Sequence, residues 1–299
     1  MKILITGATG FIGQYLVRLL RAEHDLLLVS RQPKLAARQL AVDNSKVIQL
    51  EQLHSLDGVD AIINLAGEPL AAKRWNIEQK RRISESRWVI TAELLEKLKQ
   101  SAAAPRIWIN ASAVGFYGAH GTEPLEEDYI PSHGDFPYRV CAHWEVLAQQ
   151  ASDYHCRVCI IRIGLVLGRQ GGALAKMLPA YWSGFGGPLG TGKQMVSWIT
   201  RADLADAIRF LLVHPDCHGV YNATSPYPVD NETFSATLAA VLHRPHFFRT
   251  PGWLLKLLLG EMAGLLLTGQ NVQPKRLLEA GFRFRYPELP EALRHVLED

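Results

Sequence analysis

The sequence predicts an α/β fold of the Rossmann-like, doubly wound type, with helices on both faces of a parallel sheet and a smaller C-terminal α/β substrate region. Two observations support this fold class. Short apolar runs typical of buried strands alternate with segments that repeat apolar residues at helical spacing. The first run, residues 2–6, leads directly into three spaced glycines and an apolar-periodic helix. A chain of 299 residues that is 48% hydrophobic can bury one large core or two modest ones.

The expected elements follow one another along the chain. After the first strand and its helix, strands are expected at 25–30, 47–50, 60–67, 106–110 and 157–163, with helices at 76–100 and 139–152. Residues 184–192 carry five glycines and predict a loop. A boundary near residue 165 is expected to separate a nucleotide-binding half (1–165) from a smaller substrate-side region (166–299), although the chain can cross back into the first half up to about 225.

The glycines at positions 7, 10 and 13 stand where a dinucleotide-binding fold holds a pyrophosphate. Gly7 permits the tight turn, Gly10 lets the backbone approach the phosphates, and Gly13 lets the helix pack closely on the strand. The N-terminus of the helix adds unpaired N–H groups and a partial positive charge. The sequence therefore predicts a nicotinamide dinucleotide in contact with Gly7, Thr9, Gly10, Phe11, Ile12 and Gly13.

The end of the second strand indicates which dinucleotide is bound. An acidic residue there favours NAD, whereas an arginine accommodates the 2′-phosphate of NADP. This strand ends with Ser30 and Arg31, which offer a hydroxyl donor and a charged planar fork but no carboxylate. NADP is therefore the predicted cofactor. The alternative is that Arg31 only solvates the strand end.

The fourth expected strand closes with Leu65, Ala66, Gly67 and Glu68. Small residues here would let the backbone approach a cofactor at the carboxyl edge of the sheet, where open α/β sheets bind their ligands. These four residues are predicted cofactor contacts. A structural turn would explain Gly67 equally well.

Motifs along nearly the whole chain resemble one family. The spacing Gly7-x-x-Gly10-x-x-Gly13 is that of the short-chain dehydrogenase/reductase superfamily, in its extended, epimerase-like branch. A closer resemblance is to an atypical epimerase-family subgroup, whose human member is described as an NADP-dependent oxidoreductase. It rests on residues 66–68, 74–76, 86–87, 112–118, 143–145, 162–168, 186–192 and 197–199. The run from 260 to 282 resembles the family-specific C-terminal domain, which we expect from about residue 248. The resemblance implies a fold and a cofactor but no substrate.

The resemblance also implies catalytic residues. Ser112 matches the Ser or Thr that hydrogen-bonds a substrate carbonyl or hydroxyl in extended reductases; the alternative is a hydroxyl that caps a loop. Those enzymes also carry Tyr-x-x-x-Lys, in which the Lys lowers the pKa of the Tyr. Here the two positions fall on Pro137 and Cys141, so Tyr117 or Tyr138 is left to supply a proton.

The subgroup further suggests Arg87, Ser112 and Glu145 as cofactor contacts; an ordinary surface salt bridge is the alternative for Arg87 and Glu145. Two functions stay open. The first is an NADP-dependent oxidoreductase or epimerase that acts on a small or sugar-nucleotide substrate. The second is an NADP-binding sensor or interaction protein with little or no turnover. The missing Tyr–Lys pair favours the second function, and the full cofactor site with Ser112 favours the first.

Composition argues against several other classes. The 32 basic and 29 acidic residues form no long block of one sign, so nucleic-acid binding gets no support. Cys156 and Cys159 form a C-x-x-C on an expected strand, where they point to opposite faces and cannot share a metal ion. The strand at residue 2 leaves no room for a signal peptide, and residues 253–267 are too short and too charged to span a bilayer. We expect a soluble, cytoplasmic protein without a metal or a membrane partner, for which superfamily habit suggests a homodimer.

Overall fold

The computed structural model describes residues 1–131 and 134–298, and a seven-stranded sheet forms its centre. The strand order is β11-β7-β5-β4-β1-β2-β3, and every adjacent pair is parallel. This is the order of a doubly wound fold, extended by one strand, and it confirms the predicted fold class. The strands are β1 (Lys2–Thr6), β2 (Asp25–Val29), β3 (Val47–Ile48), β4 (Ala61–Asn64), β5 (Ile107–Ala113), β7 (Arg157–Ile163) and β11 (Gly219–Ala223).

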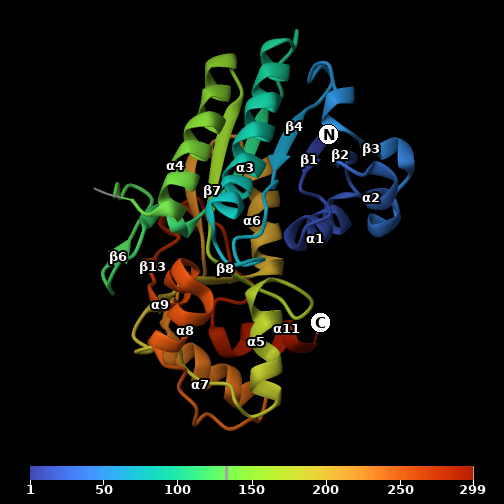
Figure 1. Cartoon of the computed structure of the whole chain (residues 1–299). Coiled ribbons are helices and arrows are strands. Elements are labelled where there is room, and N and C mark those ends of the chain that lie inside the picture. Colours follow the sequence, from blue (N-terminus) through green and yellow to red (C-terminus); the bar gives the residue numbers. More distant parts are fainter. Residues whose placement is uncertain (132–133, 299) are drawn as a thin grey trace.

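Helices cover both faces of this sheet (Figure 1). Side chains alternate along each strand, so Ile3 and Ile5 of β1 pack in one core layer while Leu4 packs in the other. In Figure 1, α3 and α4 lie in front of the sheet, and α6 lies behind it. The flanking helices are α1 (Phe11–Leu20), α2 (Pro33–Leu40), α3 (Ile77–Lys99), α4 (Phe136–Gln149) and α6 (Arg201–Val213).

A smaller unit lies at the carboxyl ends of the strands (Figure 1). The chain enters it after β7, returns to the sheet for α6 and β11, and then enters it again. Its core buries Leu174, Leu178, Trp198, Phe234 and Leu293. Short strands in this unit and beside it are β6 (Pro124–Leu125), β8 (Leu165–Leu167), β9 (Met195–Val196), β10 (Trp198–Thr200), β12 (Val229–Asp230) and β13 (Asn271–Val272). Its helices are α5 (Gly172–Trp182), α7 (Asn231–Val241), α8 (Gly252–Leu259), α9 (Gly264–Leu267), α10 (Lys275–Glu279) and α11 (Leu289–Glu298).

Several elements differ in extent from the prediction. The strand β5 runs to Ala113 rather than ending at residue 110. The helix α4 begins at Phe136 rather than at residue 139, because the Asp135 carboxylate caps its first turn by accepting from the Tyr138 N–H (3.0 Å). The strand β4 ends at Asn64, so residues 65–68 form a loop rather than its last part. The strand β3 has only two residues because Leu50 begins a 3₁₀ turn.

Two further sequence features are resolved by the fold. Cys156 and Cys159 lie in different core layers, on opposite faces of the sheet as predicted, and all four thiols are free and buried. The apolar run 253–267 is divided between α8 and α9 by a turn at Gly260, where φ is +61°. Within the described part of the chain, no helix is both long and apolar enough to cross a membrane.

Candidate functional site

The candidate site lies at the carboxyl edge of the sheet, between β1 and β4. From β1 the chain winds outward through β2 and β3, and it then returns to form β4 on the other side of β1. Open α/β sheets bind ligands at such a switch point, because the loops after the two neighbouring strands leave in opposite directions. The turn after β1 and the loop after β4 meet here, where the Leu65 N–H donates to the Thr6 carbonyl (3.2 Å).

The three glycines of the turn after β1 differ in their surroundings. Gly7 has a φ of +70°, which favours glycine, and a Cβ there would lie 2.5 Å from the Leu65 carbonyl oxygen. A Cβ at Gly13 would lie 2.3 Å from the Gly7 carbonyl oxygen, so the helix and the turn are in close contact. Among the described residues, a Cβ at Gly10 would meet only that same oxygen, at 3.1 Å. The space above Gly10 is open, as the approach of a pyrophosphate requires.

The first turn of α1 can accept an anion. No side chain of the described residues caps it, and it contains no acidic residue. The N–H groups of Phe11, Ile12 and Gly13 stand in this turn, where backbone donors have no partner within the helix. The Thr9 carbonyl just before it is held by the Gln14 side-chain amide, at 2.8 Å. The residues present therefore fit the phosphates of a dinucleotide.

The loop after β8 packs against Phe11, a contact that we did not predict from the sequence. A Cβ at Gly168 or Gly171 would lie 2.3 or 2.5 Å from the Phe11 ring. The Arg201 guanidinium lies over the same ring, 4.9 Å from its centroid. These contacts fix the first residue of α1. The glycines at 168, 171 and 172 were visible in the sequence, but their meaning depends on β8 and α5 lying beside the phosphate turn.

The end of β2 presents a free cation. The Ser30 hydroxyl oxygen accepts from the Gln32 N–H (3.1 Å), which leaves its own proton available to donate. The Arg31 side chain is exposed, and it forms no hydrogen bond or ion pair with any other residue that the structure describes. A 2′-phosphate at this strand end would meet an unpaired guanidinium. The contacts of Ser30 and Arg31 with a cofactor stay predictions.

Arg87 supports the loop after β4. Its Nη1 donates to the carbonyls of Glu68 (3.1 Å) and Ile83 (2.8 Å), and the Glu68 N–H donates to Ser86 Oγ (2.9 Å). A Cβ at Gly67 would lie 2.7 Å from Arg87 Cζ, so the loop rests directly on the guanidinium. Burial lowers the pKa of Arg87. Arg87 thus positions residues 66–68. It forms no salt bridge with any residue that the structure describes, so the alternative of an ordinary surface salt bridge is wrong, and its contact with the cofactor stays a prediction.

Buried polar side chains that we did not predict lie beneath this loop. Asn64 accepts from Thr6 Oγ1 at 2.6 Å and donates to Thr91 Oγ1 at 2.8 Å and to Asn110 Oδ1 at 2.7 Å. Trp144 Nε1 also donates to Thr91, at 2.8 Å. The sequence did contain a sign of this network, because Asn64 and Asn110 each interrupt an apolar strand. A buried amide of this kind needs hydrogen-bond partners.

A second group of side chains, the buried polar cluster (Ser112, Tyr117, Glu145, Arg162 and Asn222), joins β5, α4, β7 and β11. Arg162 binds the Glu145 carboxylate with two hydrogen bonds, from Nε to Oε1 (3.0 Å) and from Nη2 to Oε2 (2.9 Å). Ser112 Oγ also donates to Oε1, at 2.6 Å. Arg162 Nη1 donates to the Tyr117 hydroxyl (3.0 Å), which donates in turn to Asn222 Oδ1 (2.7 Å). Each member of the cluster is buried and has a partner.

Burial and pairing set the protonation states of the cluster. Burial opposes the charge on Arg162, but its hydrogen bonds to Glu145 prevail and raise the pKa of Arg162. Burial raises the pKa of Tyr117 against the influence of Arg162, so the phenol keeps its proton. Cys141 stands where extended reductases have their lysine, and burial, assisted by the Glu145 carboxylate, raises its pKa to about 11. At neutral pH the cluster is therefore one ion pair beside neutral hydroxyl and thiol groups.

Two of the three predicted catalytic residues already use their hydroxyl groups in hydrogen bonds within the protein. Ser112 is buried, and its proton is donated to Glu145. Tyr117 is buried and uses its hydroxyl on both sides, so this geometry gives no support for its role as a catalytic acid. Tyr138 is half-buried in the first turn of α4, with its ring 5.5 Å from that of Phe116. The catalytic roles of Ser112 and Tyr138 stay predictions.

Glu145 was expected to contact the cofactor or, alternatively, to form an ordinary surface salt bridge. The surface alternative is wrong, because the side chains of Arg162 and Glu145 are only 5% and 9% exposed. The cofactor contact stays a prediction, although both carboxylate oxygens already have protein partners.

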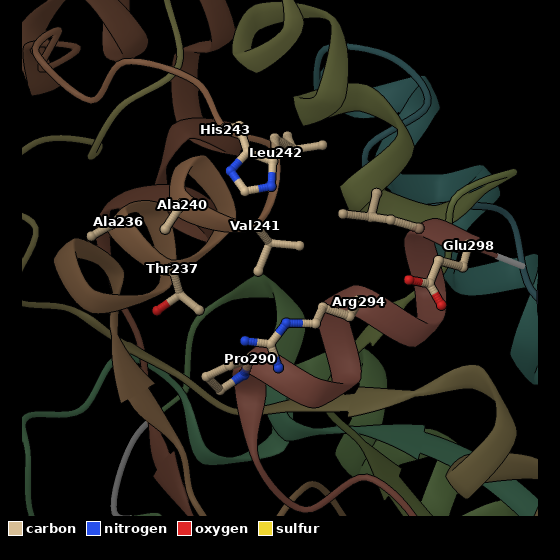
Figure 2. Close-up of a pocket in the computed structure, with 10 residues that line it drawn as sticks. Ala236, Thr237, Ala240, Val241, Leu242, His243, Pro290, Arg294 and Glu298 are labelled. Carbon is tan, nitrogen blue, oxygen red and sulfur yellow. The ribbon is translucent and has the colours of Figure 1, made fainter.

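A groove of about 650 Å³ lies elsewhere, between α7 and α11 in the smaller unit (Figure 2). Thr237 and His243 line one side of it, and Arg294 lines the other. None of its lining residues is a predicted site residue. Its size therefore does not make it the candidate site, because the backbone donors and the open glycine lie at the sheet edge.

Comparisons with known proteins bear on the family, the fold and the cofactor. The model of the "NAD dependent epimerase/dehydratase family" matches residues 3–224, and that of a domain of unknown function, DUF1731, matches residues 250–296. The chain is 40% identical over 305 residues to "epimerase family protein SDR39U1 homolog, chloroplastic" of Arabidopsis thaliana, covering all of this chain and 87% of that protein.

Two solved structures are also similar. The crystal structure of the human epimerase family protein SDR39U1 with NADPH has a TM-score of 0.92 and 33% identity, with 100% of both chains covered. The nucleoside-diphosphate sugar epimerase of Corynebacterium glutamicum has a TM-score of 0.77 and 30% identity, covering 99% of this chain and 58% of that one. The predicted cofactor is therefore the one with which the human relative was crystallised.

Proposed function

Because this chain belongs to the NAD dependent epimerase/dehydratase family, we propose that it is an NADP-dependent oxidoreductase or epimerase. The predicted family and its C-terminal domain are confirmed. The observation that carries the proposal is the turn after β1, where Gly10 is open and the first turn of α1 has no cap. The unpaired Arg31 at the end of β2 favours NADP over NAD.

The bound nicotinamide would supply or accept a hydride, and the chain would position it and the substrate. The turn after β1 holds the phosphates, and Arg87 fixes the loop after β4. The Ser112 hydroxyl already donates its hydrogen bond to Glu145. Its oxygen lone pairs are therefore suited to accept a hydrogen bond from a substrate hydroxyl. Arg162 binds both oxygens of the Glu145 carboxylate, and Oε1 also accepts the hydrogen bond from Ser112 Oγ, which fixes the direction of that hydroxyl. The substrate class that we propose is a small molecule or sugar nucleotide with a hydroxyl or carbonyl group.

A second candidate is an NADP-binding sensor or interaction protein with little turnover. This candidate is favoured because the Tyr and Lys positions of the usual Tyr-x-x-x-Lys motif hold Pro137 and the neutral thiol of Cys141. Neither group can lower the pKa of a tyrosine or act as a general acid near neutral pH.

The cofactor is tested by titrating the protein with NADPH and with NADH. A charge-assisted contact contributes about 1.5–3 kcal/mol, so NADPH should bind about tenfold to hundredfold more tightly. Arg31→Ala should remove most of this preference, whereas Arg21→Ala, an exposed arginine at the other end of α1, should keep it. Equal affinities in the unmodified protein would overturn the NADP assignment.

Turnover is tested by following NADPH consumption with a panel of carbonyl compounds. Loss of activity in Ser112→Ala, with NADPH affinity retained, is the result expected of an enzyme. Tight NADPH binding without turnover on any member of a broad panel would favour the sensor. A homodimer and a cytoplasmic location stay predictions.

A further inference from the structure

Four aromatic side chains protrude from two neighbouring loops of the smaller unit. We call this set, Trp182, Phe185, Phe247 and Phe248, the aromatic tip; its members are between 47% and 84% exposed. The loops are the end of α5 and the connection from α7 to α8, and both lie at the lower end of the molecule in Figure 1, away from the sheet. Soluble domains seldom expose several large aromatic side chains together unless they bind something.

The two loops are held together by backbone and ring contacts. The rings of Phe185 and Phe248 are 5.1 Å apart, and the Gly190 N–H donates to the Thr250 carbonyl at 2.8 Å. The Thr250 N–H donates to the Pro188 carbonyl, at 3.0 Å. A Cβ at Gly187 would overlap the Phe248 carbonyl, so the backbones touch. The exposed rings are therefore carried on an ordered support.

The tip has an uneven charge. No aspartate or glutamate occurs in the two loops of the tip or in the longer stretches 154–202 and 233–260 that contain them, although the whole chain has 29 acidic residues. Arg244, beside the tip in sequence, and Lys193 have no side-chain partner among the described residues. One carboxylate lies beside the tip, that of Glu232, and it is paired with Arg249. Glu298 lines the groove between α7 and α11 together with His243 (Figure 2).

We propose that the aromatic tip inserts into the headgroup region of a membrane that carries anionic lipids. Aromatic rings favour the membrane–water interface, and basic residues beside them are attracted to anionic headgroups. The helix α8 follows in the chain with exposed Trp253, Leu257 and Leu258 and with Lys256, which extends the same composition. The attachment is at the surface only.

Charge favours a membrane over a second copy of this chain. In a contact between two copies through the tip, neither copy would offer an acidic residue of these loops to pair with Arg244 of the other. From the sequence we expected no membrane partner, because no segment can span a bilayer; surface attachment needs no such segment. The attachment is independent of NADP binding, since the tip and the phosphate turn belong to different units.

The test is co-sedimentation of the full chain with vesicles of phosphatidylcholine alone and with vesicles that also contain phosphatidylglycerol. Binding is expected to the anionic vesicles only and to weaken as salt is added. Arg244→Gln should weaken it about fivefold. Phe185→Ala with Phe247→Ala should weaken it about tenfold or more, because both rings would leave the interface. Val146→Ala, an exposed apolar residue on α4, is the matched control and should bind as the unmodified protein does.

Unchanged NADPH affinity in the tip variants will show that they are folded. The proposal is overturned if anionic vesicles do not bind the protein, or if they bind the tip variants as well as the Val146 control. It is also overturned if the tip variants bind vesicles unchanged but sediment differently from the unmodified protein when no vesicles are present. That result would assign the tip to a contact with a second copy.

Discussion

The phosphate turn after β1 and the buried polar cluster between β5 and β7 lie along one edge of the sheet, yet they are built in opposite ways. The turn consists of backbone and glycine, and it leaves N–H groups and space unfilled. The cluster consists of charged and polar side chains that satisfy one another out of contact with water. Unfilled groups indicate readiness for a ligand, whereas satisfied buried groups fix the positions of their neighbours. The difference supports the prediction that the cofactor binds at the turn, whereas the cluster holds the adjoining strands together.

The largest effect is expected where the cluster loses its cation. Arg162→Met leaves the Glu145 carboxylate buried without its partner, and breaking a buried pair in this way costs about 3–5 kcal/mol. We expect that loss in the free energy of unfolding, measured by urea denaturation. Arg283→Met, at an exposed arginine, should change it by less than about 0.5 kcal/mol.

A double variant separates the stranded charge from lost packing. Glu145→Leu combined with Arg162→Met removes both charges, so it should cost clearly less than Arg162→Met alone. If the double variant is no more stable than the single one, the cluster is held by packing, and the contrast with the turn would lose its electrostatic basis.

The next effect distinguishes two glycines of the turn. Gly13→Ala places a Cβ 2.3 Å from the Gly7 carbonyl oxygen, and such overpacking costs about 1–3 kcal/mol, enough to outweigh the better helix propensity of alanine. Gly10→Ala meets only one atom, at 3.1 Å, and should leave stability within about 1 kcal/mol of the unmodified protein. Its Cβ would instead enter the space of the phosphates, so NADPH affinity should fall. Thermal unfolding and NADPH titration of both variants measure this; a Gly10→Ala protein that binds normally would contradict the assignment of the turn.

The same contrast explains what the sequence could reveal. The turn is local: a strand, three glycines and a helix stand within about twenty residues, so their roles follow from spacing alone. The cluster gathers residues 112, 117, 145, 162 and 222, and no local pattern brings them together. The family resemblance assigned Tyr117 to catalysis and Glu145 to cofactor binding, and Arg162 was read only as part of an apolar strand. An arginine in such a strand was the missed signal, since a buried charge requires a partner.

The ends of single elements were also predictable only where a local sequence pattern marks them. The long helix α3 was predicted to within a residue at each end, because Asn76 caps it and its apolar residues recur at helical spacing. The start of α4 was placed three residues late, because the capping role of Asp135 was not recognised. The seventh strand, β11, was not predicted as a strand, although the return of the chain toward residue 225 was expected.

A smaller effect is expected from the hydroxyl at the centre of the cluster. Tyr117→Phe leaves Asn222 Oδ1 without its donor and removes an acceptor from Arg162, which should cost about 1–2 kcal/mol of unfolding free energy. NADPH affinity should not change. Tyr129→Phe is the matched control, because that ring is exposed and lies 6.3 Å from Tyr117. Loss of turnover in a stable Tyr117→Phe protein would instead make Tyr117 part of the catalytic machinery.

The smallest effect concerns Glu127, which joins the cluster to the C-terminal domain. Its Oε1 accepts from the N–H groups of Asn222 (3.0 Å) and Arg276 (3.2 Å), and its buried Oε2 has no partner among the described residues. Burial raises the pKa of Glu127 above its ordinary value of 4.5, against the influence of these backbone donors. The native protein therefore binds this proton more tightly than the unfolded chain does.

The sign of the pH dependence follows from that difference. The contribution of Glu127 to stability is fully present below pH 4.5 and is lost as the pH rises through its raised native pKa. Glu127→Gln keeps an Oε1 acceptor and has no such proton to lose. Relative to the unmodified protein, it should gain stability across this interval, by at most about 1.4 kcal/mol per pH unit. Urea denaturation from about pH 4 to about pH 8 measures the difference.

The exposed neighbour Glu126→Gln is the control, because it removes a carboxyl group at the adjacent position of the chain, where the side chain is not buried. Parallel stability curves for Glu127→Gln and the unmodified protein would show that the carboxyl group is as well solvated as an exposed one, and that the cluster is open to water on this side.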